Sequence, residues 1–128
     1  MKTTLSKIVL IADDKPGGRE LLRTVLESGP YVVVEAVDGE DAIRQAHEHH
    51  PDLILLDLHM PFKDGFEVIR ELRSDPDFQS TPVVALTASA MQGDKEKAMA
   101  AGFTGYLTKP IRLPELRSEV ERFLGDTR

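Results

Sequence analysis

The 128-residue chain contains no cysteine and no tryptophan, and it has few aromatic residues. The absence of cysteine excludes disulfides and thiolate metal sites, and it fits a reducing compartment. Long apolar runs are also missing. The first apolar run, residues 8–12, is followed by two aspartates and is too short for a signal peptide or a membrane span. We therefore expect a cytoplasmic protein with no membrane association.

Positive charge is scarce as well, because 16 Lys and Arg residues stand against 22 Asp and Glu residues, for a net charge of -6. Non-specific nucleic-acid binding depends on clusters of Lys and Arg that neutralise phosphates. The sequence has no such cluster, so we expect no direct DNA binding and partners that are proteins or small molecules. The length favours a single domain over residues 1–128, with a core of about residues 7–124.

Short apolar runs alternate with longer amphipathic segments along the whole chain. The runs are residues 8–12, 31–36, 53–56, 83–86 and 105–108. The first, third and fourth are continuously apolar, which is typical of parallel strands covered on both faces. Between and after them, apolar residues recur at helical spacings of three and four. The pattern predicts an α/β fold, a doubly wound five-stranded parallel sheet of (βα)5 type with strand order 2-1-3-4-5.

Three segments carry more specific expectations. The helical segment 92–102 has little to bury beyond Ala98 and Met99, so it should be the least firmly packed helix. Residues 74–82 are predicted to form a polar loop. His47 and His50 lie three residues apart on a helix, as two metal ligands can. No further ligand is placed near them, however, and histidine suits the end of a helix, so we favour a structural role.

Polar residues gather directly after the strands, and these positions meet at one edge of a parallel sheet. The residues that follow the first, third, fourth and fifth strands, most of them polar, are Asp13, Asp14, Asp57, Thr87, Ala88, Thr108, Lys109 and Pro110. Each close pair of carboxylates would repel by roughly 4 kcal/mol at an effective dielectric of about 20, so a positive group must lie among them. Oxygen ligands without His or Cys favour Mg²⁺, and Lys109 supplies a second positive charge. Carboxylate, metal, ammonium and hydroxyl together favour phosphoryl transfer onto a carboxylate.

Four segments resemble the receiver domain of bacterial response regulators, in family order and at family-like intervals. They are "LIADDKP", "PDLILLDLHMPFKDGFEV", "PVVALTASA" and "GYLTKPI", and the resemblance covers nearly the whole chain. It implies a CheY-like receiver fold in a two-component or phosphorelay system. It also implies Mg²⁺ as cofactor, with Mn²⁺ as a substitute.

The resemblance assigns a role to each residue of the site. It makes Asp57 the phosphoacceptor, Asp14 a direct metal ligand and Asp13 a ligand mostly through water. Asp57 and the backbone carbonyl of His59 complete the metal ligands. Thr87 becomes the switch hydroxyl, Lys109 the cation that contacts the phosphate and Tyr106 the aromatic switch residue. Ala88 is small and leaves the entrance to the acceptor open, and the peptide bond before Pro110 is expected to be cis.

By the same resemblance, the chain is a signalling switch and not an enzyme in the usual sense, although it assists its own phosphorylation and dephosphorylation. A histidine kinase or histidine phosphotransferase would supply the phosphoryl group. The face formed by the fourth helix, the fifth strand and the fifth helix would then change and control a protein partner, or the phosphate would pass onward. Only "GDTR" follows the last helix, which predicts a stand-alone receiver; a receiver cut from a hybrid kinase would look the same.

Two other classes of protein place acids or phosphates at such a sheet edge. Haloacid-dehalogenase-type phosphatases also use an aspartate at a strand end as nucleophile. In sequences similar to that class, a second Asp follows two residues later as general acid, whereas this chain has His59 there. This chain also has no room for a cap domain. A flavodoxin-like mononucleotide binder would hold a phosphate at the first loop, where Asp13 and Asp14 would repel it.

Overall fold

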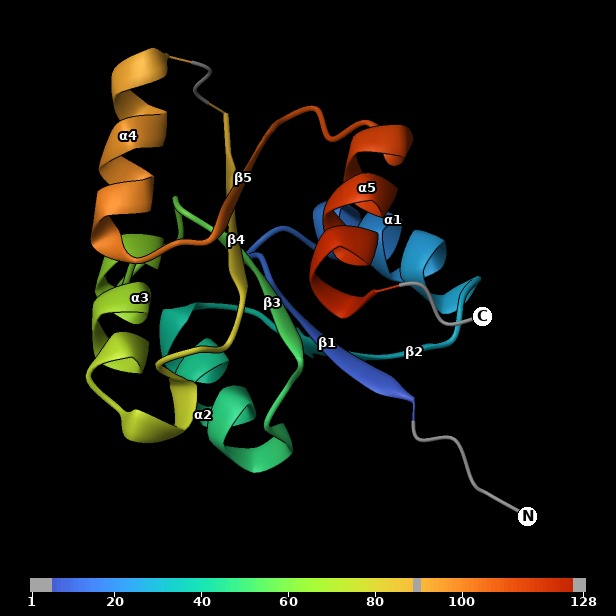
Figure 1. Cartoon of the computed structure of the whole chain (residues 1–128), viewed down its shortest axis with the longest axis horizontal. Coiled ribbons are helices and arrows are strands. Elements are labelled where there is room, and N and C mark those ends of the chain that lie inside the picture. The colour runs from blue at the N-terminus through green and yellow to red at the C-terminus, as the bar shows by residue number, and fades with distance from the viewer. Residues whose placement is uncertain (1–5, 89–90, 126–128) are drawn as a thin grey trace.

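The structure is a computed structural model that describes residues 6–88 and 91–125. Its sheet has five parallel strands in the order β2-β1-β3-β4-β5, which confirms the predicted order (Figure 1). The strands are β1 (Lys7–Ala12), β2 (Tyr31–Ala36), β3 (Leu53–Asp57), β4 (Val83–Thr87) and β5 (Gly105–Thr108). The sheet therefore has its topological switch between β1 and β3, where successive connections leave in opposite directions.

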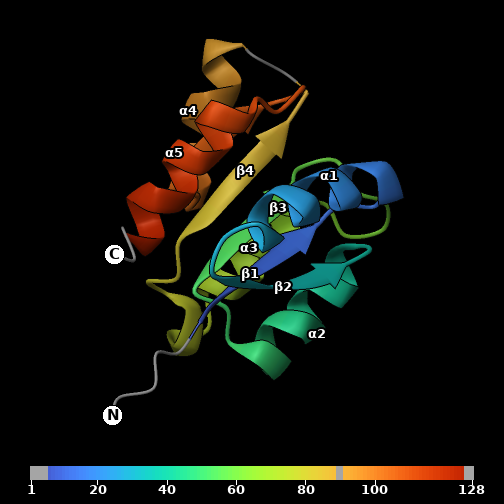
Figure 2. The ribbon, with the colours of Figure 1, turned by 90° about the vertical axis from the view of Figure 1, so that its right-hand side faces the viewer.

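Helices cover both faces of the sheet (Figure 2). They are α1 (Pro16–Glu27), α2 (Gly39–His49), α3 (Gly65–Arg73), α4 (Gln92–Ala101) and α5 (Leu113–Leu124), with a short 3₁₀ helix η1 (Pro76–Phe78). The helices α1 and α5 lie on one face, and α2, α3 and α4 lie on the other. Within the described part of the chain, no helix combines the length and the apolar character that crossing a membrane requires.

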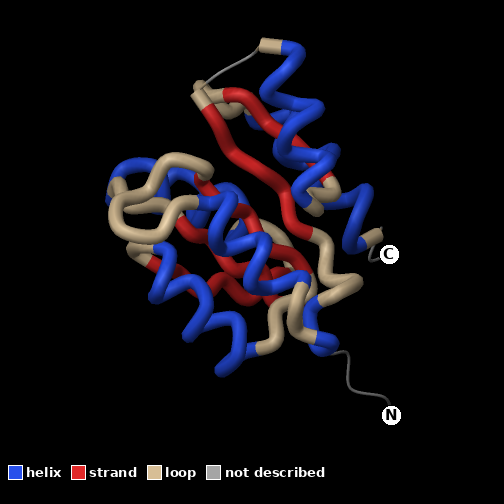
Figure 3. Tube along the Cα trace, turned by 90° about the vertical axis from the view of Figure 1, so that its left-hand side faces the viewer, coloured by secondary structure: helices blue, strands red, loops and turns tan. Residues whose placement is uncertain are grey.

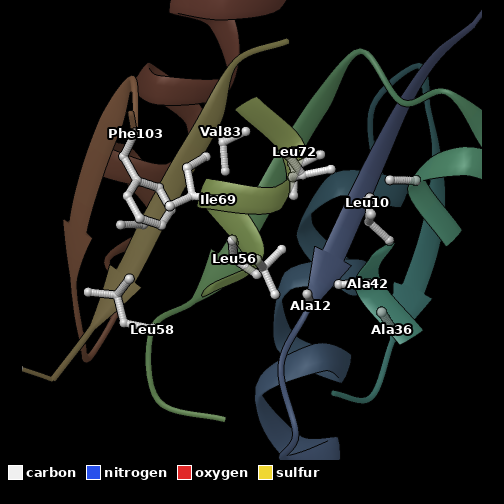
Figure 4. Close-up of a cluster of buried hydrophobic side chains, with 14 of the residues drawn as sticks. Leu10, Ala12, Ala36, Ala42, Leu56, Leu58, Ile69, Leu72, Val83 and Phe103 are labelled. Carbon is white, nitrogen blue, oxygen red and sulfur yellow. The ribbon is translucent and has the colours of Figure 1, made fainter. Parts of the chain in front are cut away.

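The continuous apolar runs divide their side chains between two cores. In β1, Val9 and Ile11 face α1 and α5, whereas Leu10 and Ala12 face the other three helices. This division follows from the alternation of side chains along a strand. Figure 4 shows the second core, where Leu10 and Leu56 lie among side chains from α2 and α3. Both faces of β3 are buried, which explains why its sequence is apolar up to Asp57.

Two strands run one residue further than the sequence indicated. β3 includes Asp57, which pairs with Leu86, and β4 includes Thr87, which pairs with Thr108. The apolar pattern ends one residue before each of these positions, whereas the backbone ladder continues. The side chains of Asp57 and Thr87 therefore project from the sheet and not from loops.

The helix α4 is attached to the rest of the fold by few apolar groups. Ala98 is fully buried, as expected, but Met99 is 40% exposed, so the expectation that both are buried was wrong for Met99. The ammonium of Lys97 lies 5.1 Å from the centre of the Phe66 ring. Because Ala98 is small and Met99 is largely outside the core, a shift of α4 would cost little buried apolar area.

The segment 74–82 is not the purely polar loop that the sequence predicted. It contains η1, and the Phe78 side chain of this short helix is 1% exposed. The ring packs between two histidines of the α2 end, edge-on to His47 at 5.1 Å and stacked on His50 at 5.9 Å. The two histidines are therefore packing residues of a small aromatic cluster, which agrees with the structural role favoured above.

The His47 ring has a hydrogen-bond acceptor at each nitrogen. Its Nδ1 atom lies 3.0 Å from the carbonyl oxygen of Ile43, and its Nε2 atom lies 3.0 Å from Oδ2 of Asp75. Only the protonated ring can donate to both. The carbonyl of Ile43 and the carboxylate of Asp75 accordingly raise the pKa of His47, and the amide of Asp77 and His47 lower the pKa of Asp75.

We predict that Asp75→Asn lowers the pKa of His47 toward its ordinary value of about 6.5, measured by NMR titration of the ring protons. Because folding raises the pKa of His47, the contribution of the pair is complete below the unfolded pKa and disappears as the pH rises through the folded pKa. At low pH, the contribution of the pair to stability disappears as the pH falls through the folded pKa of Asp75 and this carboxylate is protonated. Half of the His47 side chain is exposed, so the stability effect should be small. Equal His47 pKa values in the two proteins would contradict this account.

Candidate functional site

The loops that follow β1 and β3 lie at the same end of the sheet, beside the switch point between these two strands (Figure 2); in the opposite view of Figure 3, this end lies at the upper left. Parallel strands direct the residues after each of them to this carboxyl edge, which is where ligands bind in open α/β sheets. Asp13 and Asp14 follow β1 directly, Asp57 ends β3, and Lys109 follows β5. The fold therefore delivers residues from distant parts of the sequence to one place.

The structure brings the three predicted acids together. Asp13, Asp14 and Asp57 each offer a carboxylate oxygen, and these atoms lie within 4.8 Å of one another. Asp13 is 1% exposed and Asp57 is 3% exposed, so two of the acids are nearly out of water. Buried carboxylates at this separation repel strongly unless cations compensate them.

One compensating cation is Lys109. Its Nζ atom lies 3.0 Å from Oδ2 of Asp57 and 3.5 Å from Oδ2 of Asp13. Burial lowers the pKa of Lys109, but the hydrogen bond and charge of Asp57 and the charge of Asp13 outweigh burial and raise it. The lysine therefore stays protonated between the two acids. The Lys109–Pro110 peptide bond is cis, as predicted.

Backbone groups fix the positions of the two buried acids. The amide of His59 donates to Oδ1 of Asp57 at 3.0 Å, and the amide of Lys15 donates to Oδ1 of Asp13 at 2.9 Å. The side chain of His59 is exposed, so the residue touches the site through its backbone. Each of these hydrogen bonds orients one carboxylate and leaves its other oxygen for a cation.

Sequence reasoning missed two residues that support Asp13. Nη1 of Arg19 donates to the backbone oxygen of Asp13 at 2.8 Å, while its Nε atom bonds to Glu35. At Gly18 an added Cβ would lie 2.5 Å from Oδ2 of Asp13, so only glycine leaves this carboxylate its space. The signal for Gly18 was the weak helix start of Pro16, Gly17 and Gly18, since glycine is a poor helix former. No pattern marked Arg19, because its partners come from other elements.

The acids have a donor set suited to a hard divalent cation. Among the described residues, Oδ1 of Asp14 is the buried side-chain oxygen for which the structure shows no hydrogen-bond partner. A buried carboxylate oxygen without a partner is costly, and a metal ion would compensate it. Together with Asp13 and Asp57 it forms an all-oxygen set of the kind that Mg²⁺ prefers. The residues present therefore fit a magnesium ion.

Thr87 and Tyr106 form a second group beside the acids. Thr87 is 1% exposed at the end of β4, and Ala88 after it is exposed. Burial and the charge of Asp94 raise the pKa of Tyr106, and a hydrogen bond with the Thr87 side chain opposes them. Tyr106 also lines the groove between α4, β5 and α5. This links the strand next to the acids with the surface between α4 and α5.

The combination of a doubly wound five-stranded sheet and an acidic pocket with a lysine at its switch point defines a class of signalling domain. The family model of the response regulator receiver domain matches residues 9–121. The chain therefore belongs to the response regulator receiver domain family, as part of a two-component system. This assignment confirms the resemblance found in the sequence.

Known proteins similar to this chain span nearly its whole length. The polar-differentiation response regulator DivK of Brucella ovis is 37% identical over 122 residues, covering 95% of this chain and 99% of the relative. The receiver domain of sensor histidine kinase PA1611 from Pseudomonas aeruginosa, solved with magnesium in its active site cleft, is 34% identical with a TM-score of 0.86, covering 95% and 100%. Chemotaxis protein CheY4 of Vibrio cholerae is 30% identical with a TM-score of 0.88, covering 93% and 99%.

Proposed function

We propose that this receiver is a phosphorylation-dependent switch that accepts a phosphoryl group on Asp57 from a phosphohistidine donor. One observation carries the proposal, namely the meeting of Asp13, Asp14 and Asp57 within 4.8 Å, with Lys109 bonded to the buried Asp57. Phosphoryl transfer needs positioning and charge compensation more than acid-base catalysis, and this arrangement offers both.

In this proposal Mg²⁺ would be held by Asp13, Asp14, Asp57 and the backbone carbonyl of His59. Asp13 would act mostly through water. The ion supplies positive charge that neutralises the carboxylates and the incoming phosphoryl oxygens. The unpartnered Oδ1 atom of Asp14 supports its assignment as a direct ligand. Receiver domains bind Mg²⁺ at such acidic clusters, and the donor set here gives no independent support for Mn²⁺.

Transfer itself requires little chemistry from the protein. An oxygen of the Asp57 carboxylate attacks phosphorus, the bond between phosphorus and the donor's ring nitrogen breaks, and the imidazole leaves and takes a proton. The product is an acyl phosphate on Asp57. Lys109, which lies 3.0 Å from Asp57, can follow the phosphoryl oxygens as a mobile point charge. Ala88 adds no bulk at the entrance.

The phosphohistidine donor would be a histidine kinase or a histidine phosphotransferase. A groove of about 260 Å³ runs beside the acids, between α1 and the segment that follows β5. Leu21, Leu22, Pro110 and Ile111 give it apolar walls, and Asp13 and Lys109 also line it. Because Lys109, which bonds to Asp57, lines this apolar groove, the groove suits a protein that must rest there while its histidine reaches Asp57.

Phosphorylation adds about -1.5 to -2 charges at Asp57 and gives the Thr87 hydroxyl a new acceptor. Thr87 would then exchange its bond with Tyr106 for one with the phosphate, and the tyrosine would adjust with it. Tyr106 lines a groove of about 580 Å³ between α4, β5 and α5, together with Met91, Lys95 and Glu119. A change here alters the face that we propose binds the downstream protein, or a relay partner.

The phosphatase alternative is less well supported by the site. Such an enzyme uses a second acid two residues after the nucleophile, and His59 occupies that position with an exposed side chain. The mononucleotide alternative fails for an electrostatic reason, because the buried Asp13 and the neighbouring Asp14 lie where its phosphate would bind. A switch that assists its own phosphorylation and dephosphorylation fits the site better than either.

The proposal is tested by the intact mass of the protein after incubation with phosphoramidate, in Mg²⁺ and in EDTA. We expect one phosphoryl group to be gained in Mg²⁺ and none in EDTA. Equal gain in both solutions would contradict a metal-dependent site, and no gain in either would contradict the acceptor role.

Metal binding by itself gives a separate prediction. We expect Asp14→Asn to weaken Mg²⁺ binding by about tenfold or more, since one charged ligand is lost. The measurement is calorimetric titration of the unphosphorylated protein. Glu48→Gln, an exposed change on α2, controls for the loss of one negative charge. If both variants bound Mg²⁺ as the wild type does, Asp14 would not be a ligand.

A further inference from the structure

The most exposed large apolar side chain described in this protein lies on the loop that follows Asp57 in the chain. Phe62 is 92% exposed, on the loop that connects β3 with α3. This loop starts directly after Asp57, and Met60, two residues before Phe62 on the same loop, is buried. A fully presented phenyl group has no role in the packing of the fold, because it touches little of it.

The backbone at Phe62 adopts an unfavourable conformation. Its φ is 71°, in the left-handed region that favours glycine. The amide of Lys63 donates to the carbonyl of Pro61 at 2.8 Å, which closes a γ-turn with Phe62 at its apex. Strained backbone of this kind persists when the surroundings hold it, and it concentrates at functional sites.

The surroundings of Phe62 do hold the loop. Nζ of Lys63 lies 2.6 Å from Glu71 of α3 and 3.6 Å from Glu40 of α2. An added Cβ on Gly39 would lie only 2.1 Å from the backbone oxygen of Lys63, so the loop rests closely against the start of α2. On the other side of the turn, an added Cβ on Gly65 would lie 2.8 Å from the backbone oxygen of Asp57 and from Cα of Leu58. The phenyl group is therefore presented outward from a fixed base.

We propose that Phe62 is an anchor residue that inserts into an apolar pocket of the phosphohistidine donor. Rigidly presented aromatic residues dominate binding energy in protein interfaces, because little conformational entropy is lost when they bind. The donor is favoured over a downstream target because the loop begins at Asp57, and only the donor must approach that carboxylate to bonding distance. This inference rests on the proposed function and names a contact of the same site.

The test compares two kinds of phosphoryl donor. Each histidine kinase and phosphotransferase of the source genome is purified and phosphorylated, and the one that transfers fastest to the wild-type chain is the protein donor. Acetyl phosphate is the small donor. For Phe62→Ala we expect kcat/KM with the protein donor to fall by about tenfold to thirtyfold. The rate with acetyl phosphate, which has no surface to dock, should not fall.

Two further variants separate docking from folding. Phe62→Gly relieves the positive φ, so it should unfold at the same or a higher temperature than the wild type while losing transfer from the protein donor. Val32→Ala removes a half-exposed apolar side chain on β2 and should transfer as the wild type does. A loss of transfer that merely followed a loss of thermal stability would overturn the inference.

The outcomes distinguish this inference from the proposed function. If neither donor phosphorylates the wild type, the proposed function fails. If Phe62→Ala accepts phosphate from the protein donor at the wild-type rate, or if only acetyl phosphate phosphorylates the wild type, the docking inference fails and the acceptor assignment stands. Concentration-dependent dimerisation of the wild type that Phe62→Ala abolishes would assign Phe62 to a second copy of this chain and overturn the inference.

Discussion

Asp57→Asn is expected to gain no phosphoryl group from phosphoramidate, in Mg²⁺ or in EDTA, under conditions in which the wild-type chain gains one. Asparagine keeps the size of the side chain, but its amide is not a nucleophile. The variant should remain folded, because the change removes one of three mutually repelling carboxylates and leaves Asp13 as a partner of Lys109. Intact mass gives the result, and circular dichroism confirms the fold.

A matched control removes a carboxylate elsewhere. Asp77 is exposed on η1, before β4, and therefore lies away from the carboxyl edge of the sheet. We expect Asp77→Asn to gain phosphate as the wild type does. Phosphorylation of Asp57→Asn at the wild-type level would show that another group is the acceptor.

The second large effect is expected on stability, from the loss of Arg73 at the end of α3. Its Nη1 atom donates to the carbonyls of Phe78 at 2.6 Å and Thr81 at 2.8 Å. Its Nε and Nη2 atoms donate to the carbonyl of Gly102, after α4, at 3.0 and 2.8 Å. One half-buried guanidinium thus connects α3, η1 and the α4–β5 turn.

We expect Arg73→Ala to reduce the free energy of unfolding by about 3 kcal/mol, because charged hydrogen bonds to three carbonyls are lost together. The melting temperature should fall by roughly 10 °C, measured by calorimetry. Arg70→Ala, on the exposed side of the same helix, should change stability by less than about 0.5 kcal/mol. Equal losses in the two variants would mean that the carbonyl contacts contribute nothing specific.

Much of the fold could be predicted from the sequence because a parallel sheet covered on both faces leaves a simple pattern. Continuous apolar runs identified the strands, and their alternation with helical spacing led to the order that the structure has. The gathering of Asp13, Asp14, Asp57 and Lys109 followed from the geometry of such a sheet. Each of these residues comes after or at the end of an apolar run, so its place could be read directly.

The remaining features depend on tertiary contacts that leave no period in the sequence. A single phenylalanine in a polar segment gave no sign that Phe78 would be buried between His47 and His50. Arg19 and Arg73 act on backbone carbonyls of other elements, and any carbonyl looks the same in a sequence. The strain at Phe62 was equally hidden, because its φ is set by the close packing of the loop.

The central claim, that Asp57 accepts the phosphoryl group, is tested most directly by locating the modification. Sodium borohydride reduces an acyl phosphate to an alcohol, so treatment of the phosphorylated protein, followed by proteolysis and tandem mass spectrometry, marks the modified residue. The account predicts homoserine at position 57, formed in Mg²⁺ and absent in EDTA. Reduction at another carboxylate, or a phosphoryl group that stays on one of the histidines and resists borohydride, would contradict it.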